Sequence, residues 1–376
     1  MADHAALLSQ FEKLLNAQAE RAQRLSEAVP FDFTQRPLTI GLIPGDGIGP
    51  IIMKSAQAVL NTLLEKEISS GEITLRPIEG LTIENRLARN ESIPSDVLAE
   101  IKQCPVLLKG PTTTPTGGTM TSANVTLRKE LDLFSNVRPV RVESEGIDWT
   151  FFRENTEGEY TLGSSGIEID GLMTMDFKVT TVAGTRRIAK AAYDFARATG
   201  RTHVAIVTKA NIMKKTDGLF SKICHEVASE YPEITTEEYF VDIMSANLVN
   251  PQIRSKFQVI LAPNLYGDIL TDEAAQIQGG VGTAGSANTG SRYAMFEAIH
   301  GSAPRMLEEG LGDYASPESI LQAAAMMLDH IGCVGHAEKL RSAINRVKSD
   351  GIIVDGTRSG ATCAAFSDAL LEELKR

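Results

Sequence analysis

Two aspartates, Asp268 and Asp272, lie four residues apart in a segment that is expected to begin a helix. Residues at positions i and i+4 lie on one face of a helix, so both carboxylates would point the same way and repel each other. A divalent cation such as Mg²⁺ or Mn²⁺ prefers oxygen ligands and would remove that repulsion. A third carboxylate, Asp242, follows the strand-like run 238–241. The three aspartates predict a magnesium or manganese site, with a solvated acidic helix face as the alternative.

Residues suited to binding an anion recur along the chain. The segment that begins with Lys109 follows a strand and is rich in threonine and glycine, so its N–H groups and hydroxyls could face an anion. Further on, Arg128, Arg138 and Arg153 could converge on carboxylates with bidentate geometry. Arg138 lies in an apolar run, where an unpaired arginine would be costly. Arg141 is instead expected on an exposed face.

Three more side chains have types suited to catalysis or ligand binding. Tyr160 follows the charged stretch 153–159, and Lys209 lies just past a strand. A phenol or an amine can transfer protons when burial or a nearby cation lowers its pKa. His300 lies in a loop of small residues, which suits the close approach of a flat ring. Taken singly, tyrosine and lysine are more often structural, so the prediction depends on finding these groups together.

The elements that would hold these side chains alternate between strands and helices, which indicates an α/β architecture with largely parallel sheets. Strands are expected at residues 38–43, 73–78, 106–109, 203–208, 237–241 and 259–262. Helices are expected at residues 51–64, 95–103, 185–199, 216–229, 317–330 and 337–348, the last of which would close the chain. The alternating segment 163–181 predicts a β hairpin that forms an arm between subunits.

A glycine-rich turn at residues 45–49 raises the question of a Rossmann fold. Pro50 stands where the motif requires its third glycine, so a Rossmann fold is not expected and a tight strand-to-helix turn is predicted instead. The length of 376 residues favours two domains. A net charge of −11 disfavours binding to nucleic acids or to anionic membranes. No apolar run is long enough to span a bilayer.

Cysteine usage and the N-terminal segment bear on the compartment. The four cysteines are scattered, so a disulfide framework and structural zinc are both unexpected, and a reducing environment fits. Residues 1–35 read as an amphipathic helical extension, which lacks the unbroken apolar core of a secretory signal. Its acidic residues also disfavour a mitochondrial transit peptide. A cytoplasmic location is expected.

Together the motifs resemble those of the isocitrate/isopropylmalate dehydrogenase family, the metal-dependent decarboxylating dehydrogenases, over residues 38–376. The matching motifs occur in the family's order at residues 43–50, 108–111, 127–131, 137–139, 153–158, 264–268 and 297–304. The resemblance implies a two-lobed fold with parallel-rich sheets. Its large, cofactor-side domain would comprise residues 36–132 and 279–376. Its small domain, residues 133–278, would carry the dimer-forming hairpin arm.

The resemblance also assigns roles to side chains. It implies that Arg128, Arg138 and Arg153 hold the carboxylates of a small tricarboxylate substrate and that Tyr160 and Lys209 are the catalytic pair. It implies a homodimer with shared active sites, in which Lys209 and one of the metal aspartates Asp242, Asp268 and Asp272 cross to the partner. The residues expected to bind the nicotinamide cofactor are Lys109, Thr113, Thr114, Asn211, Glu297, His300, Gly301, Ser302, Ala303, Pro304 and Arg305.

Ser122 and Asn124 decide the expected substrate, because isocitrate enzymes resemble this chain in carrying that pair after the threonine loop. Both can donate hydrogen bonds to the extra carboxylate of isocitrate. The expected reaction is oxidation of isocitrate to 2-oxoglutarate and carbon dioxide, in the tricarboxylic acid cycle. Lys209 would remove the hydroxyl proton and Tyr160 would protonate the enolate. Homoisocitrate, 3-isopropylmalate, malate or tartrate remain alternatives, as does a non-catalytic regulatory subunit, which would be expected to lose part of the catalytic set.

The choice between NAD and NADP rests on Arg305. Family members that use NAD usually carry an acidic residue near this position, whereas an arginine suits the 2′-phosphate of NADP. NADP is therefore favoured. NAD stays as the alternative, because the companion tyrosine and arginine of phosphate-binding bacterial enzymes are not found near the C-terminus. Ile51 and Ser316 are further departures from the family pattern.

Overall fold

The computed structural model describes residues 4–25, 30–115, 120–163, 165–169, 171–280 and 282–376. The chain divides into two compact units. Unit 1 comprises Met1–Pro30 and Phe134–Ile277, and unit 2 comprises Phe31–Leu133 and Gln278–Arg376. The N-terminal helix, expected to be a separate extension, is thus grouped with unit 1. The assignment of cofactor binding to the larger domain stays a prediction.

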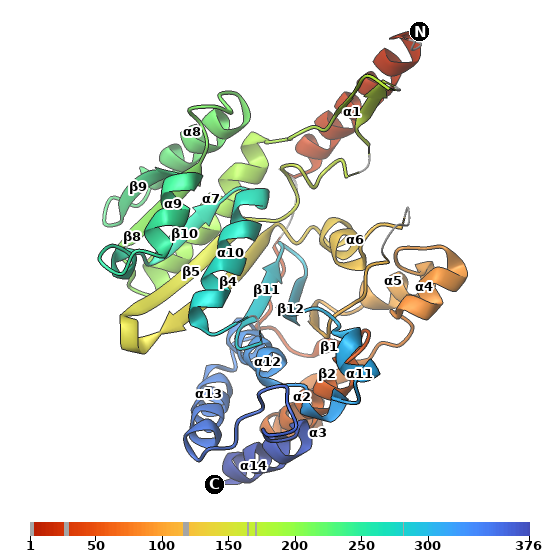
Figure 1. Ribbon diagram of the computed structural model, residues 1–376, viewed down its shortest axis with the longest axis vertical. Helices are drawn as coiled ribbons and strands as arrows, with labels where there is room; N and C mark the ends of the chain where they lie inside the picture. Colours follow the sequence, from red (N-terminus) through yellow and green to blue (C-terminus); the bar gives the residue numbers. More distant parts are fainter. Residues whose placement is uncertain (1–3, 26–29, 116–119, 164, 170, 281) are drawn as a thin grey trace. The chain divides into compact units, whose positions relative to one another are not determined.

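Unit 1 is a five-stranded sheet between two pairs of helices (Figure 1). The strands lie in the order β4 (Ser135–Val142), β5 (Ile147–Glu154), β10 (Val259–Ala262), β8 (His203–Thr208) and β9 (Thr235–Phe240). Only β4 and β5 pair antiparallel; the other neighbours are parallel. Helices α7 (Val182–Ala198) and α8 (Thr216–Ala228) cover one face, and α9 (Val241–Leu248) and α10 (Asn264–Gln278) cover the other.

The apolar pattern of the strands explains this layering. In β8, Val204 and Ile206 pack with α7 and α8, whereas Ala205 and Val207 pack with α9 and α10. Successive side chains of a strand point to opposite faces, so a strand covered on both faces is apolar throughout. The N-cap of α7 is Thr181, whose hydroxyl accepts the Gly184 N–H at 3.0 Å. That bond satisfies one of the free N–H groups at the start of the helix.

Unit 2 is also built on five strands. They lie in the order β2 (Ile73–Pro77), β1 (Leu38–Ile43), β3 (Val106–Lys109), β12 (Ala294–Ala298) and β11 (Gly285–Thr289). The pair of β11 and β12 is antiparallel and the rest are parallel. The helices in the layers around this sheet are α2 (Gly49–Leu63), α5 (Ser95–Ile101), α6 (Ala123–Glu130), α12 (Glu318–His330), α13 (Val334–Ser349) and α14 (Cys363–Lys375).

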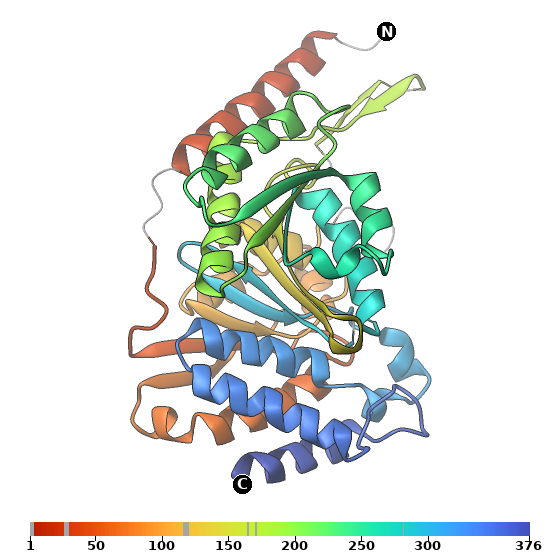
Figure 2. The ribbon, with the colours of Figure 1, turned by 90° about the vertical axis from the view of Figure 1, so that its left-hand side faces the viewer.

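Helices also cover both faces of the unit 2 sheet. Helices α5 and α6 pack on one face, around Leu107 and Leu127. Helix α12 packs against β3, β11 and β12, with α13 and α14 beyond it, as the blue helices in Figure 2 show. Helices α3 (Glu65–Ser69), α4 (Ile83–Arg89) and α11 (Pro304–Glu308) lie in the connections. The predicted α/β class with mostly parallel strands is confirmed.

Several predicted elements are confirmed, and two predictions are wrong. The predicted bounds of β1, β3, β8 and β10 agree with the structure. The expectation that residues 337–348 close the chain is wrong, because α14 follows and packs on α2 and α13. Val241, expected to end a strand, begins α9, so Asp242 lies in the first turn of a helix. In the part of the chain that the structure describes, no helix combines the length and apolar character needed to cross a membrane.

The hairpin arm and the N-terminal helix lie against one another in unit 1. Strands β6 (Ile167–Ile169) and β7 (Met173–Met175) pair antiparallel, while the predicted hairpin's residues 164 and 170 lie outside the described residues. Helix α1 (His4–Arg24) places the ring of Phe11 5.6 Å from that of Phe177, just after β7. The role of the arm between subunits stays a prediction.

Candidate active site

Arg153, near the end of β5, is held by two residues of α10. Its Nε and one terminal nitrogen donate to Asn264 Oδ1 at 3.0 and 2.6 Å, and its other terminal nitrogen pairs with the Asp268 carboxylate. The Tyr160 hydroxyl donates to the second oxygen of Asp268 at 2.7 Å. Arg153 is 1% exposed, so these partners compensate a charge that burial would otherwise penalise. The structure thus brings together three residues that the sequence singled out.

Arg138, on the adjacent strand β4, engages the next turn of the same helix. It donates to Thr271 Oγ1 at 2.8 Å and to Asp272 Oδ1 at 3.0 Å, and it lies 3.9 Å from Asp268 Oδ1. Both aspartates of the i, i+4 pair therefore face arginines. The Asp268 side chain is 33% exposed and that of Asp272 is 65% exposed, so both carboxylates keep access to solvent. Arg141, on the same strand, points instead to an exposed pair with Asp148.

Lys209 and Asp242 form a second group in unit 1. Lys209 follows β8, and its ammonium pairs with the carboxylate of Asp242 at the start of α9. The hydrogen bond from Lys209 lowers the pKa of Asp242 below its usual value. Among the described residues of this single chain, no three His, Cys, Asp or Glu side chains gather in a way that could hold a metal ion. The expected supply of one metal aspartate by a partner stays a prediction.

In unit 2, Arg128 belongs to a buried charged network. Glu297 of β12 lies opposite Lys109 of β3 in the sheet register. Its carboxylate is 3.4 Å from the Lys109 ammonium and 3.4 Å from an Arg128 terminal nitrogen, and it accepts the Asn288 amide at 2.8 Å. Burial would raise the pKa of Glu297, but Lys109 and Arg128 hold it below its usual value. The network orients Arg128 and keeps Glu297 ionised.

The same network surrounds the amine of Lys109. That amine is fully buried and also donates to the Gly110 carbonyl at 2.9 Å. Burial lowers its pKa, and Glu297 opposes that effect. The predicted contacts of Lys109 and Glu297 with a cofactor stay predictions. Their placement gives them a structural task as well, because together they hold Arg128.

The glycine-rich turn after β1 ties two predicted cofactor loops together. Asp46 accepts the backbone N–H groups of Thr113 and Ile83, both at 2.7 Å. The Thr113 hydroxyl lies 2.6 Å from the Ser302 hydroxyl. Gly47 has a φ of 59°, and an added Cβ there would lie 2.0 Å from the Ser302 carbonyl oxygen, so only glycine fits. The predicted strand-to-helix turn is confirmed; sequence reasoning missed the role of Asp46, whose signal was a carboxylate between two glycines.

The loop that contains His300 leads into α11. The His300 Nδ1 lies 2.9 Å from the Gly301 carbonyl, to which it must donate. Burial lowers the pKa of His300, so the neutral ring is favoured and presents Nε2 as an acceptor. Ala303 has a φ of 45° at the N-cap of α11, which begins at Pro304. Arg305 is 85% exposed and pairs with a glutamate one turn later in the same helix.

The remaining predicted ligand residues are more open. Ser122 occupies the N-cap of α6, and Asn124 Oδ1 accepts the Thr112 hydroxyl at 3.1 Å, which leaves the Asn124 amide NH₂ group to donate. Thr114 is exposed, and residues 116–119 of the threonine loop lie outside the described residues. Asn211 is exposed in unit 1, whereas the other predicted cofactor residues lie in unit 2.

The sequence can now be placed among known proteins. The model of the isocitrate/isopropylmalate dehydrogenase family matches residues 39–370 of the chain. The chain belongs to this family. The family's match excludes helix α1, which precedes it. The family assignment that the motifs implied is therefore confirmed.

The relatives of this chain include isocitrate dehydrogenases named for NADP and for NAD. The isocitrate dehydrogenase (NADP) of Rickettsia prowazekii is 40% identical over 326 residues, which are 84% of this chain and 64% of that protein. The probable isocitrate dehydrogenase (NAD) subunit alpha, mitochondrial, of Caenorhabditis elegans is 37% identical over 346 residues, 89% of this chain and 92% of that protein. The chain thus spans about two thirds of the Rickettsia relative and most of the nematode one.

A solved structure agrees with the fold. The crystal structure of isocitrate dehydrogenase from Methylococcus capsulatus matches with a TM-score of 0.79 at 35% identity, covering 90% of this chain and all of that chain. The family implies a divalent metal and a nicotinamide. Asp268 and Asp272 fit the metal, because two partly exposed carboxylates on one helix face are oxygen donors. The neutral His300 ring and the hydrogen-bonded hydroxyls of Thr113 and Ser302 fit a flat, polar cofactor.

Proposed function

We propose that this chain oxidises isocitrate with a nicotinamide cofactor and releases carbon dioxide, giving 2-oxoglutarate. The observation that carries the proposal is the cluster at α10, where Asp268 and Asp272 face Arg153 and Arg138 and where the Tyr160 hydroxyl donates to Asp268. Paired carboxylates suit a divalent cation, guanidinium groups suit a carboxylate substrate, and a phenol suits proton delivery. Metal binding, binding of the substrate carboxylates and proton delivery each have a candidate group in this cluster.

Binding falls to the arginines and to the polar pair of α6. Arg128, Arg138 and Arg153 hold substrate carboxylates, because bidentate contacts fix a carboxylate's orientation as well as its place. Ser122 and Asn124 donate hydrogen bonds to the carboxylate that isocitrate carries and malate lacks. A site with such donors discriminates strongly against a substrate that leaves them unpaired.

Two proton movements accompany the redox step. A bound nicotinamide would accept the hydride from the substrate carbon. Lys209, as the free amine and acting through water or Asp242, removes the hydroxyl proton. Carbon dioxide then leaves, and Tyr160 protonates the carbon that retains the electron pair. The Tyr160 hydroxyl donates to Asp268, so it carries the proton that an acid must supply. Asp268 and Asp272, with Asp242 of a second copy, would hold a divalent cation, whose positive charge would favour ionisation of the hydroxyl.

The cofactor is NADP in this proposal, with NAD as the alternative. An exposed Arg305 could meet a 2′-phosphate if it left its helical partner Glu309, a pair that is weak at an exposed site. The names of the relatives include both cofactors, so they do not decide the matter. A homodimer and a cytoplasmic location stay predictions, the latter because the nematode relative is named as mitochondrial.

A panel assay tests the proposal. Purified protein with Mn²⁺ is offered isocitrate, homoisocitrate, 3-isopropylmalate, malate and tartrate, each with NAD and with NADP, and reduced cofactor is followed at its absorbance. Isocitrate should give the highest kcat/KM, and a chelator should abolish turnover until Mn²⁺ or Mg²⁺ is restored. A different preferred substrate would overturn the substrate assignment. Isocitrate binding without turnover of any substrate would indicate a regulatory subunit.

Two variants of β4 provide a matched test of the arginine cluster. Arg138→Met removes the guanidinium that faces Asp272, whereas Arg141→Met removes one from the exposed side of the same strand. The first should raise KM for isocitrate at least tenfold, and the second should leave KM unchanged. Equal effects of the two variants would show that Arg138 has no special relation to substrate.

A further inference from the structure

Unit 1 contains a buried ion pair that the proposed chemistry does not use. The Lys178 ammonium lies 2.6 Å from Asp217 Oδ1, and the two side chains are 6% and 0% exposed. Lys178 follows the hairpin arm, and Asp217 lies in the first turn of α8. Burying two charges costs desolvation energy that their attraction does not always repay, so such a pair is weak evidence for stability alone. Its surroundings suggest another role.

The second oxygen of Asp217 is bonded to the main chain of a predicted catalytic residue. Asp217 Oδ2 accepts the backbone N–H of Lys209 at 2.7 Å. Lys209 lies just past the end of β8, where the regular sheet hydrogen bonds stop. The carboxylate therefore replaces a strand partner and fixes the backbone from which the Lys209 side chain extends.

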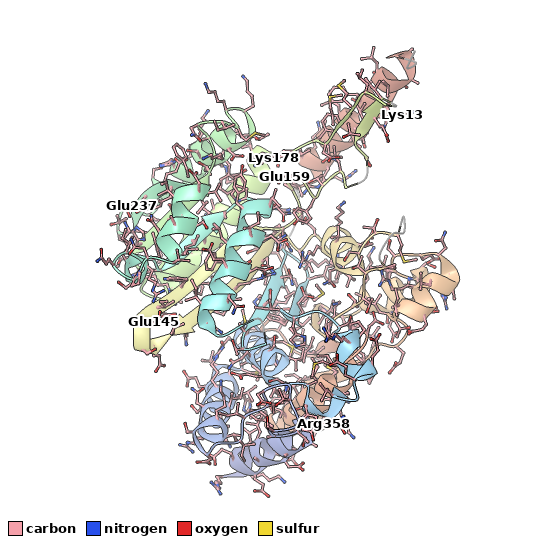
Figure 3. The ribbon with its side chains drawn as sticks, in the orientation of Figure 1. Lys13, Glu145, Glu159, Lys178, Glu237 and Arg358 are labelled. Atoms are coloured by element: carbon pink, nitrogen blue, oxygen red, sulfur yellow. The ribbon has the colours of Figure 1, made fainter. Side chains whose placement is uncertain are left out.

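The ammonium of Lys178 reaches two further segments that carry site residues. It lies 3.3 Å from Glu159 Oε1, beside Tyr160 in the chain, and 4.3 Å from the ring centroid of Tyr266, two residues before Asp268. Figure 3 shows Lys178 and Glu159 next to each other in unit 1. Burial would lower the pKa of Lys178, but the bond to Asp217 and the charge of Glu159 raise it, so the cation persists. Burial raises the pKa of the Tyr266 phenol, which stays neutral.

We propose that Lys178 and Asp217 are positioning residues that fix Lys209 relative to the segments bearing Tyr160 and Asp268. The inference rests on the proposed function, since it assigns a task in that reaction. Asp217 anchors the Lys209 backbone, and Lys178 holds Asp217 in the orientation that makes the anchor. Neither side chain needs to touch substrate, so the loss of either should slow turnover more than it weakens substrate binding.

Three variants separate the anchor from the charge. Asp217→Ala removes the acceptor of the Lys209 N–H, and Lys178→Met leaves the Asp217 charge buried with one partner fewer. The double variant Lys178→Met/Asp217→Asn has no ion pair but keeps an amide oxygen that can accept the Lys209 N–H. Lys190→Met is the control, because it removes an exposed lysine of α7 whose partner Glu230 is 3.7 Å away.

Steady-state kinetics with isocitrate and thermal melts provide the readouts. We expect each single variant to lower kcat about 10–100-fold with KM within threefold, the double variant to recover kcat to within about fivefold of wild type, and the control to behave as wild type. Unchanged kcat in Asp217→Ala, or a double variant as slow as the singles, would overturn the proposal. If Asp217→Ala fails to fold, Lys178→Met and the double variant decide the question.

A readout that needs no activity separates this inference from the proposed function. Hydrogen exchange of the Lys209 amide should be faster in Lys178→Met than in wild type and should slow again in the double variant. If wild type does not oxidise isocitrate but the exchange follows this order, the proposed function fails and the anchor stands. If wild type is active and the exchange does not change, the positioning role of Lys178 and Asp217 is refuted and the proposed function is unaffected.

Discussion

Replacing Gly267 by alanine should disable the site without unfolding the protein. Gly267 lies in α10 beside Asp268, and an added Cβ would lie 2.7 Å from Cγ and 2.8 Å from Cβ of Arg153. Carbon atoms in contact prefer about 3.5–4.0 Å, so the Arg153 stem must move by roughly 1 Å. These are the atoms nearest the backbone of β5, and the residue is buried, so the arginine cannot swing aside freely. The guanidinium would leave its positions at Asn264 and Asp268.

The magnitude follows from two opposing effects on stability and one on catalysis. Alanine in a helix interior gains about 1 kcal/mol over glycine, whereas overpacking costs about 1–3 kcal/mol, so unfolding free energy should fall by no more than about 2 kcal/mol. A misplacement of about 1 Å in a binding group can reduce the rate about 10²-fold. We therefore expect kcat/KM for isocitrate to fall about 100-fold, which is about 2.7 kcal/mol of transition-state stabilisation.

The assay compares two glycine-to-alanine variants. Gly335 lies in α13, and a Cβ added there would meet nothing within 4 Å. Gly335→Ala should keep wild-type kcat/KM and gain up to about 1 kcal/mol of stability in urea melts. A Gly267→Ala protein with wild-type kcat/KM would refute the reasoning, because it would show that Arg153 can be displaced without consequence.

Three further outcomes are expected. Burial and the nearby Glu157 charge raise the pKa of Glu154 to about 7 from 4.5. Unfolding therefore releases a proton between about pH 4.5 and 7, and the free energy of unfolding falls by roughly 2–3 kcal/mol as pH rises through that window. Glu154→Gln should flatten this part of the pH profile in urea melts, and an equal slope in both proteins would contradict the assignment. Arg305→Asp should lower the ratio of kcat/KM for NADP to that for NAD, and a constant ratio would place Arg305 away from the 2′-phosphate. Arg21 of α1 donates to Glu157 at 3.2 Å, so Arg21→Met should lower the free energy of unfolding by about 1–3 kcal/mol. Arg24 is exposed, so Arg24→Met should leave the free energy of unfolding unchanged. Equal losses in the two variants would count against a stabilising role for the contact between Arg21 and Glu157.

The strands that were predictable are those that are mostly apolar along their length. Both faces of β1, β3, β8 and β10 are covered, so most of their side chains are buried and apolar. That apolar run is visible in the sequence. Strand β11 reads Gly-Ser-Ala-Asn-Thr, which is typical of a turn, and it is a strand because β12 pairs with it and α12 covers it. Pro139 similarly argues against a strand at β4, because proline lacks the N–H that a sheet hydrogen bond needs. The residue lies in a strand because β4 pairs with β5 along its length. Such contacts lie far apart in the chain and leave no local signal.

The features of the site also divide into those that the sequence predicts and those that depend on the fold. The spacing of Asp268 and Asp272 places both on one helix face, and this was readable from the chain alone. Their partners Arg153 and Arg138 come from strands more than a hundred residues earlier, so the specific pairing depends on the fold. Asp217 carries no signal of its own in the sequence, because its task is defined by a backbone N–H that any residue would offer.

The order of strands in unit 2 has a consequence for synthesis of the protein. Strand β12 pairs with β3, yet all of Phe134–Ile277 is translated between them. A nascent chain must therefore carry β3 with the backbone N–H and C=O groups of one edge unpaired while unit 1 is being made and folded. An exposed strand edge invites pairing with other chains, and contacts between distant segments form slowly. We expect unit 2 to complete its sheet only after β11 and β12 have been synthesised and β12 can pair with β3.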